Sequence, residues 1–443
     1  MAEPQPPTAG GGRPLSDRLG PFRHRAFAVY WAGGSLSNIG TWLQAVAGSI
    51  FVYQLTGSAL AVGVLNFAGF MPILLFSVAG GVISDRFDRR DVVIVTHLIS
   101  GGFALGLALA TFAGIASEIH VIAAAFAINT SWAVAKPSVI SILPGLVPRE
   151  EVTDAVGLNT LQFILGQVGG PTIAALVMAT AGAGWAFTAN AVTFLGPILS
   201  MLYLRRRGLG APAPVDRASD AGGGPPLSAV AFVREQPWVL ALLAGVVATS
   251  APLEVVRTLS PAFAVEALGE PESSAGLIVA AQSVGSAVAL IVFVPLRRRG
   301  LEREMAATGL FLQAAGLLAT AFAPTLTFAA GAVSLVGFGF SLCFPILTGT
   351  LQAEVPDHVR GRVMAFHQMA HLGNRPLTAL VVGILATLVT ARWTILAGLV
   401  LIPIGLVASQ RAWQRLRGAR DEATAADVAA KAVEASAASE RGG

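Results

Sequence analysis

The sequence predicts an all-α membrane protein with about twelve transmembrane helices in two pseudo-symmetric six-helix halves. Of its 443 residues, 54% are hydrophobic and only 12% are charged, and the mean hydropathy is +0.69. Apolar runs long enough for a helix to cross a bilayer, which takes about 20 residues, recur at near-regular spacing. One long polar stretch separates the first six runs from the last six. These three observations fit a chain whose solvent is mostly lipid.

The apolar runs set the predicted spans and domains. The N-terminal stretch lacks the short apolar core and small-residue cleavage site of a signal peptide, so the first run is expected to remain as a helix. The expected spans are 26–53, 59–83, 92–114, 119–143, 155–181, 183–204, 237–264, 274–296, 303–323, 325–350, 363–388 and 391–409. We expect a disordered tail at 1–21, an N-terminal half at 22–204, a cytoplasmic linker at 205–236, a C-terminal half at 237–409 and a cytoplasmic tail at 410–443.

Arginines mark one side of the predicted membrane. The even-numbered connections and both termini hold nearly all arginines that lie outside the spans, whereas the odd-numbered connections hold only Arg392. Basic residues beside span ends remain on the cytoplasmic side. Both termini are therefore predicted to be cytoplasmic.

The two halves resemble each other. The fourth span ends in LVPREEV, with Pro148, and the tenth ends in AEVPDHV, with Pro356. The span that follows each of them carries a proline, at Pro171 and Pro376. Internal repeats of six helices are typical of secondary transporters, whose substrate sites lie between the halves near the bilayer midplane.

A short charged turn joins the second and third spans. It reads GGVISDRFDRR from Gly80 to Arg90, and it resembles the Gly-x-x-x-Asp-Arg-x-x-Arg-Arg signature of the major facilitator superfamily. The matching residues are Gly81, Asp85, Arg86, Arg89 and Arg90. The segments LSNIGTWLQ, YQLTGSALAVG and LPGLVPREEV resemble a bacterial branch that includes enterobactin-exporter-like and macrolide-efflux-like permeases. This resemblance covers roughly residues 22–409.

The resemblance has three departures. Thr41 stands where the branch often has an acidic residue, and Gln167 or its neighbours stand where it often has an arginine. The segment PLRRRGLERE after the eighth span keeps arginines but lacks the Gly-x-x-x-Asp core. These departures bear on substrate and coupling ion rather than on the fold.

Asp85 has two interpretations. Its carboxylate can meet the partially positive N-terminus of a neighbouring helix or pair with arginines. A contact that forms in one conformation and breaks in the other would act as a latch on a cytoplasmic gate, and the motif favours this interpretation. The alternative is an ordinary charged turn that fixes topology.

Charged residues inside spans are costly and are functional candidates. Glu254 is the one acidic residue clearly in mid-span, and Arg257 lies one helical turn further. Glu254 is either a proton-accepting group or half of a permanent structural ion pair. Lys136 and Arg375 are the other cations predicted in the interior, although Lys136 could extend to the cytoplasmic surface. Three positive charges against one negative charge favour an anionic or strongly polar substrate.

Other polar and small residues inside the spans are weaker candidates. Asn38 and Gln44 could line the substrate path or hold helices together. Gly166, Gly170 and Pro171 resemble the helix-5 pattern of antiporters in the superfamily, and generic helix packing also explains them. His367 and His371 have the i, i+4 spacing of a metal pair, but no third ligand is evident, so we expect no metal site.

We therefore expect a rocker-switch permease that exports a small organic molecule, siderophore-like or antibiotic-like, across a bacterial inner membrane. No GxxxxGK[ST] loop is present for ATP, so proton antiport is the expected coupling. We expect a monomer with no cofactor and no nucleic-acid partner. A nutrient or metabolite importer on the same fold remains open. An intramembrane enzyme and a transport-dead sensor or scaffold have less support.

Overall fold

The computed structural model describes residues 19–210, 227–299 and 301–415. These residues form two compact units. The N-unit comprises residues 19–210 and 271–280, and the C-unit comprises 227–270, 281–299 and 301–415. Most of the expected N-terminal tail, the middle of the expected linker and most of the expected C-terminal tail lie outside the described residues.

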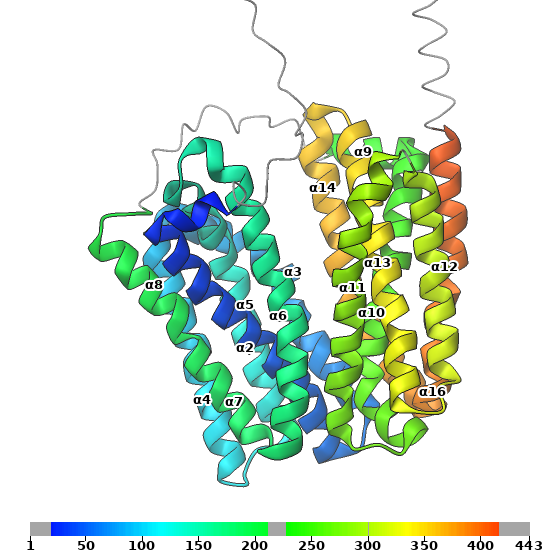
Figure 1. Ribbon diagram of the computed structural model, residues 1–443, viewed down its shortest axis with the longest axis horizontal. Coiled ribbons are helices and arrows are strands. Elements are labelled where there is room, and N and C mark those ends of the chain that lie inside the picture. Colours follow the sequence, from blue (N-terminus) through cyan, green and yellow to red (C-terminus); the bar gives the residue numbers. More distant parts are fainter. Residues whose placement is uncertain (1–18, 211–226, 300, 416–443) are drawn as a thin grey trace, which may run out of the picture. The chain divides into compact units, whose positions relative to one another are not determined.

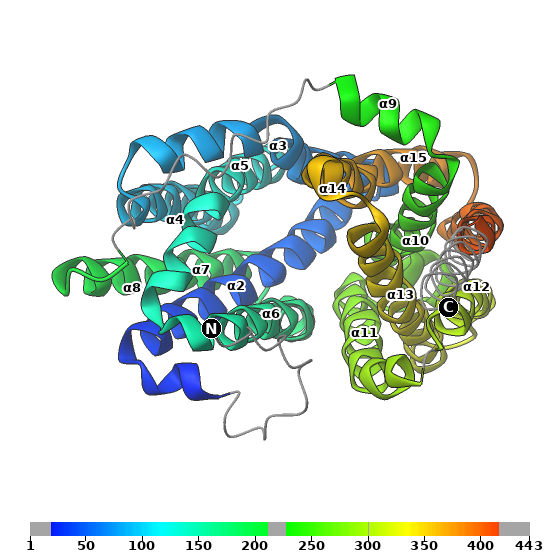
Figure 2. The ribbon, with the colours of Figure 1, turned by 90° about the horizontal axis from the view of Figure 1, so that it is seen from above.

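The N-unit is a bundle of long helices (Figures 1 and 2). Within it, α3 packs on α5, α2 packs on α6, and α4 packs on both α5 and α7. Its elements are η1 (Gly20–Arg23), α2 (Arg25–Thr56), α3 (Ala59–Arg86), α4 (Arg89–Phe112), α5 (Glu118–Ile142), η2 (Leu143–Leu146), η3 (Arg149–Glu151), α6 (Val152–Thr180), α7 (Ala183–Thr193), α8 (Leu195–Arg206) and η4 (Glu272–Ser274).

The C-unit is a second helical bundle, in which α12 packs on α13, and α10 packs on α13 and α15. The first residues of α11 belong to the N-unit and the rest to the C-unit. The helices are α9 (Leu227–Glu235), α10 (Pro237–Leu268), α11 (Ala275–Arg298), α12 (Glu302–Ala321), α13 (Leu326–Glu354), α14 (Asp357–Leu372), α15 (Asn374–Leu388), α16 (Ala391–Thr394) and η5 (Ile395–Val400), followed by a helical segment at residues 401–415.

The described helices confirm the predicted all-α membrane fold. Nine helices in the described part of the chain are long and apolar enough to cross a membrane. The remaining predicted spans correspond to α2, α12 and the pair α14–α15. Polar residues interrupt α2, charged residues open α12, and a break at Gly373 divides α14 from α15. The predicted count of about twelve fits this arrangement.

The helix ends follow from local sequence. Ser58 caps α3 by accepting a hydrogen bond from the Ala61 amide at 3.3 Å, and Thr325 caps α13 in the same way. Gly57, at φ 60°, ends α2 in the left-handed conformation that glycine adopts without strain. Arg392 donates to the carbonyls of Ala321 and Ala267 at 2.9 and 2.6 Å. The one arginine on the predicted outer side therefore caps the C-terminal ends of α12 and α10.

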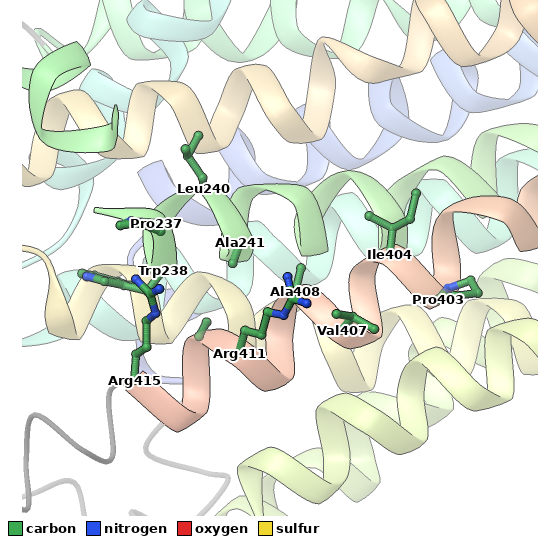
Figure 3. A pocket seen from close by; sticks show the side chains of 11 residues that line it. Pro237, Trp238, Leu240, Ala241, Pro403, Ile404, Val407, Ala408, Arg411 and Arg415 are labelled. Atoms are coloured by element: carbon green, nitrogen blue, oxygen red, sulfur yellow. The ribbon is translucent and has the colours of Figure 1, made fainter. Parts of the chain in front are cut away.

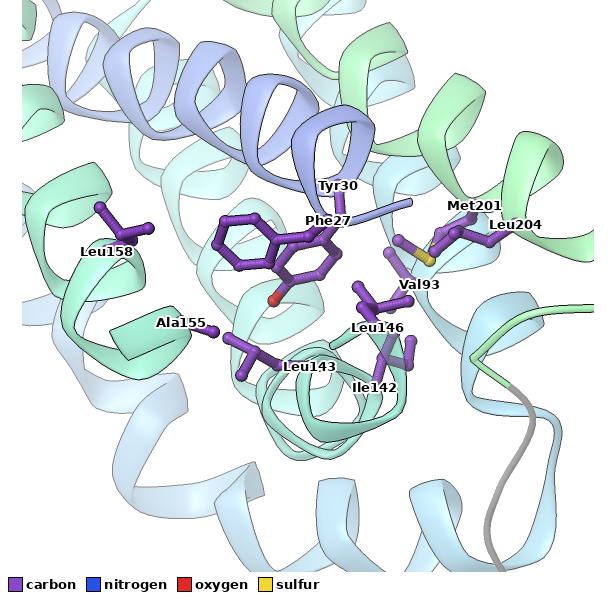
Figure 4. Packing of buried hydrophobic residues seen from close by; sticks show 10 residues of the cluster. All are labelled: Phe27, Tyr30, Val93, Ile142, Leu143, Leu146, Ala155, Leu158, Met201 and Leu204. Atoms are coloured by element: carbon purple, nitrogen blue, oxygen red, sulfur yellow. The ribbon is translucent and has the colours of Figure 1, made fainter. Parts of the chain in front are cut away.

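Bulky apolar side chains fill one end of the N-unit (Figure 4). Phe27 and Tyr30 of α2 lie at the centre of this cluster, and the Tyr30 hydroxyl donates to the Val139 carbonyl at 3.1 Å. The other members are Val93, Ile142, Leu143, Leu146, Ala155, Leu158, Met201 and Leu204. The cluster joins α2, α4, α5, α6 and α8 near the turn that carries the arginine-rich motif.

Candidate transport site and gate motif

Helix α10 carries the predicted mid-span acid into the interior of the C-unit. Every residue from Ala248 to Ala264 is buried. Pro252 and Pro261 interrupt the backbone hydrogen bonding of this segment, since proline has no N–H. The Ser260 hydroxyl donates at 3.0 Å to the Arg257 carbonyl, the group that Pro261 leaves without its usual amide donor. The sequence thus builds a buried, locally irregular helix around Glu254.

Glu254 is the one carboxylate that is buried among the described side chains, with 1% exposure. Thr258, one turn further along α10, donates its hydroxyl to Glu254 Oε1 at 3.3 Å. Glu254 Oε2 has no hydrogen-bond partner within the described part of the chain. A buried carboxylate usually fills most of its acceptor positions. This acid is therefore sparsely satisfied for its depth.

Two arginines are buried in the same part of the C-unit as this carboxylate. Arg257 and Arg375 are each 8% exposed, and both interact electrostatically with Glu254. Arg257 Nε donates to Gln282 Oε1 at 3.2 Å, and Gln282 Nε2 donates to the Leu253 carbonyl at 3.2 Å. With Glu254 ionised, these three charged groups carry one net positive charge. We call Glu254, Arg257, Gln282 and Arg375 the C-unit charge cluster.

The break between α14 and α15 brings Arg375 to this cluster. Asn374, just before it, donates to Ser250 Oγ on α10 at 2.9 Å and to the His371 carbonyl at 3.0 Å. It also donates to the Ala370 carbonyl. These contacts tie the broken helix to α10 beside Glu254.

The predicted histidine pair lies on α14 among aromatic rings. The ring centroids of His371 and Phe344 are 4.4 Å apart, and His367 Nε2 lies 2.9 Å from the Thr348 hydroxyl. Within the described residues, no group of three or more His, Cys, Asp and Glu side chains is placed to hold a metal ion.

The N-unit contains a separate polar network. Asn190 Nδ2 on α7 donates to Gln44 Oε1 at 2.5 Å, and Thr193 donates its hydroxyl to Asn190 Oδ1 at 3.0 Å. Gln44 and Asn190 are both buried, so this contact joins α2 to α7. Lys136 is exposed rather than buried, and its ammonium lies 4.5 Å from the centroid of the Trp132 ring. Lys136 lies along an aromatic ring at the helix surface, where a flexible stem keeps the charge out of the core.

Gly166 and Gly170 lie where α6 crosses α2. A Cβ atom on Gly166 would lie 3.0 Å from the backbone and Cβ of Asn38. On Gly170 it would overlap Trp42 Cβ and lie 2.8 Å from the Leu43 amide nitrogen. Asn38 is half-buried at this crossing, and Pro171 continues α6 just beyond it. The absence of side chains lets the two backbones approach closely.

The residues of the arginine-rich motif divide into two groups. Arg89 donates to the Ser141 carbonyl at the end of α5 at 3.3 Å, and Arg90 donates to the Leu209 carbonyl at 3.1 Å. Arg90 also pairs with Asp88 at 2.6 Å, and this hydrogen bond lowers the pKa of the Asp88 carboxyl. These contacts hold the turn against the rest of the N-unit.

Asp85 and Arg86 form the second group, at the end of α3. Both are exposed, and Asp85 makes no hydrogen bond or ion pair with any described residue. A Cβ on Gly81 would meet no atom within 4 Å. The structure therefore leaves Asp85 available on the surface of the N-unit, while Arg89 and Arg90 are engaged.

Known proteins are similar to this chain over nearly its whole length. A family model described as transmembrane secretion effector (MFS_3) matches residues 16–443. The chain belongs to the major facilitator superfamily. Its curated relatives also confirm the predicted bacterial branch.

Three of these relatives have names that describe efflux. The multidrug efflux pump Tap of Mycolicibacterium fortuitum is 27% identical over 88% of this chain and 95% of its own length. The enterobactin exporter EntS of Salmonella choleraesuis is 26% identical over 87% of this chain and 91% of its own length. The macrolide efflux protein A of Streptococcus pyogenes is 27% identical over 40% of this chain and 43% of its own length.

A solved structure supports the fold. A bacterial homologue of the human lysosomal transporter Spinster has a TM-score of 0.70 and 14% identity, covering 89% of this chain and 98% of that one. At this identity the likeness shows the fold alone. The family match and the names of the relatives show that this major facilitator protein is a multi-pass membrane transport protein rather than an enzyme.

The structure also identifies residues that the sequence analysis missed. Gln282 holds Arg257 within the C-unit charge cluster, and Asn190 holds Gln44 in the N-unit. Each is a single amide within an apolar run, AAQSVG and FTANAV respectively. That signal was present, because a buried amide in a membrane span needs a partner.

Proposed function

We propose that this protein exports a small organic molecule, siderophore-like or antibiotic-like, from a bacterial cytoplasm by alternating access and proton antiport. It works as a monomer in the inner membrane, with both termini cytoplasmic. The efflux names of its curated relatives support the direction. The observation that carries the proton coupling is Glu254, a buried carboxylate with an unfilled acceptor position in a transport protein.

Glu254 has the features that a proton carrier needs. Burial in the C-unit penalises its ionised form, whereas the nearby Arg257 and Arg375 stabilise that form. Because these two effects oppose each other, a small change in the surroundings of Glu254 can make its carboxyl group take up or release a proton. A movement that alters the separation of these groups would therefore couple protonation to conformation.

The excess of positive charge in the C-unit charge cluster indicates the class of substrate. Arg257 and Arg375 outnumber Glu254, so the cluster favours a molecule with an acidic or strongly polar group. The test is an uptake panel in energised everted membrane vesicles, made from cells with and without the protein. Acidic siderophore-like compounds, macrolides and cationic dyes are measured by mass spectrometry. We expect acidic compounds to accumulate more than cationic dyes, and a strong preference for cationic dyes would contradict the assignment.

The same panel tests direction. Accumulation in everted vesicles corresponds to export from the cell. Uptake only into right-side-out vesicles would instead indicate an importer and overturn the proposed direction.

Asp85 is proposed to be a latch residue, because it is exposed at the end of α3 while the neighbouring Arg89 and Arg90 are engaged within the N-unit. Asp85→Asn removes the charge with little change in volume and is expected to shift the resting conformation. The measurement is the labelling rate of single cysteines introduced at each membrane face. Asp91→Asn is the control, since Asp91 forms a surface ion pair with Arg205 at 2.8 Å. Labelling of Asp85→Asn that matches wild type on both faces would reject the latch.

A further inference from the structure

An apolar groove with two arginines at one end lies on the surface of the C-unit (Figure 3). It has a volume of about 620 Å³ and lies between the start of α10 and the helical segment at residues 401–415. Leu240, Ile404 and Val407 line it and are about half exposed. Apart from Arg411 and Arg415, no charged residue lines it among those that the structure describes.

The charged end of the groove is built from two adjacent turns of one helix. Arg411 and Arg415 are four residues apart, so their side chains project from the same face. Figure 3 shows the Arg415 side chain extending toward Trp238 and the Arg411 side chain extending toward Ala408. Both are exposed, and neither forms an ion pair with a described acidic residue.

The dimensions of the groove match half of a bilayer. The helix rises about 12 Å from Pro403 to Arg411 and about 18 Å to Arg415, at 1.5 Å per residue. One leaflet of the hydrocarbon core is about 15 Å thick. With Pro403, the middle of the apolar span 391–415, at the bilayer midplane, the apolar side chains would lie along an acyl chain, and Arg411 and Arg415 would lie near the headgroup. Trp238 lies at the same level, where tryptophan is enriched in membrane proteins.

We propose that this groove binds one anionic glycerophospholipid. An acyl chain lies along Leu240, Ile404 and Val407, and the phosphate is held by Arg411 and Arg415. Guanidinium groups bind phosphate oxygens in a bidentate geometry, and two arginines without an ion pair to any described acidic residue complement a headgroup that has no compensating positive charge. Basic pockets between helices on the cytoplasmic side of a membrane bind anionic lipid headgroups in this manner. The bound lipid would contact both ends of the groove and so join α10, which carries Glu254, to the last helix.

The test is native mass spectrometry of the full-length protein in detergent, titrated with phosphatidylglycerol or phosphatidylcholine. Wild type is expected to bind the first phosphatidylglycerol roughly 10- to 30-fold more tightly than phosphatidylcholine, from the contribution of two interfacial arginines. Arg411→Gln with Arg415→Gln should remove most of this preference, and Arg411→Lys with Arg415→Lys should keep much of it. Arg297→Gln with Arg299→Gln is the matched control, because these exposed arginines do not line the groove.

A second variant tests the apolar part of the site. Ala408→Trp fills the groove without removing a charge, and it should weaken binding of the first phosphatidylglycerol. If wild type and Arg411→Gln with Arg415→Gln bind phosphatidylglycerol equally, the proposal is overturned. Occupation of the groove by another part of the chain would give this result. Displacement of the lipid by glycerol phosphate at similar concentration would also overturn it, because the acyl chain would then contribute nothing. A change from dimer to monomer in Ala408→Trp would identify a subunit interface instead.

Discussion

Glu254→Gln is expected to reduce proton-dependent export to the level of vesicles that lack the protein. Gln keeps the shape and one acceptor of the side chain but cannot release or take up a proton. The measurement is substrate accumulation in everted vesicles over a range of pH. Wild-type accumulation should vary with pH, and the residual flux of the variant should not.

Two further variants make this result specific. Glu254→Asp keeps a titratable group and should retain part of the pH-dependent transport. Glu266→Gln makes the same chemical change at an exposed position of α10 and should leave transport near wild type. Gln can still accept the hydrogen bond that Glu266 receives from the Ala391 amide at 3.0 Å. Transport by Glu254→Gln with an unchanged pH dependence would exclude Glu254 as the proton carrier.

Gly170→Ala is expected to destabilise the protein even though alanine favours helices over glycine. The added Cβ would overlap Trp42 Cβ and lie 2.8 Å from the Leu43 nitrogen and 2.9 Å from the Ile39 carbonyl. Two of these neighbours are backbone atoms, so the conflict is relieved only if α6 moves away from α2. Overpacking of this kind costs about 1–3 kcal/mol, more than the roughly 0.5–1 kcal/mol that alanine gains in a helix.

Gly169→Ala is the matched control for this prediction. A Cβ at Gly169 would meet only Ile39 Cγ1, at 4.0 Å, which is ordinary van der Waals contact. Compared with wild type, the midpoint of thermal unfolding in detergent should therefore be lower for Gly170→Ala and equal or higher for Gly169→Ala. Equal midpoints in the two variants would contradict the close crossing of α2 and α6.

The arrangement of spans could be predicted from sequence because the bilayer imposes one length on every crossing. The charged turn at Gly80–Arg90 and the run containing Glu254 could be found because charged residues are rare among the apolar runs of this chain. Breaks within some of the predicted spans were missed. The spans at 183–204 and 363–388 read as continuous apolar runs, whereas the structure divides them near Phe194 and at Gly373.

The partners of the candidate residues could not be predicted, because helix periodicity does not say which distant helix lies opposite. Arg257 lies one helical turn from Glu254, as its spacing indicates, but the sequence did not reveal that its Nε also donates to Gln282, 25 residues away. Gln44 was a lone amide in sequence and is bonded to Asn190 across 146 residues. Lys136 interrupts an apolar run, and the sequence left open whether its charge is buried or extends to the cytoplasmic surface. Its helix face is exposed beside Trp132, which hydropathy alone does not reveal.

The central claim is that a proton gradient drives export, and collapsing that gradient tests it most directly. Everted vesicles containing the wild-type protein are loaded with the best substrate of the panel, and accumulation is followed before and after a protonophore is added. The account predicts that accumulation stops and the stored substrate flows out, while vesicles without the protein show no change. Accumulation that continues at the same rate after the collapse would leave a transporter but contradict proton antiport.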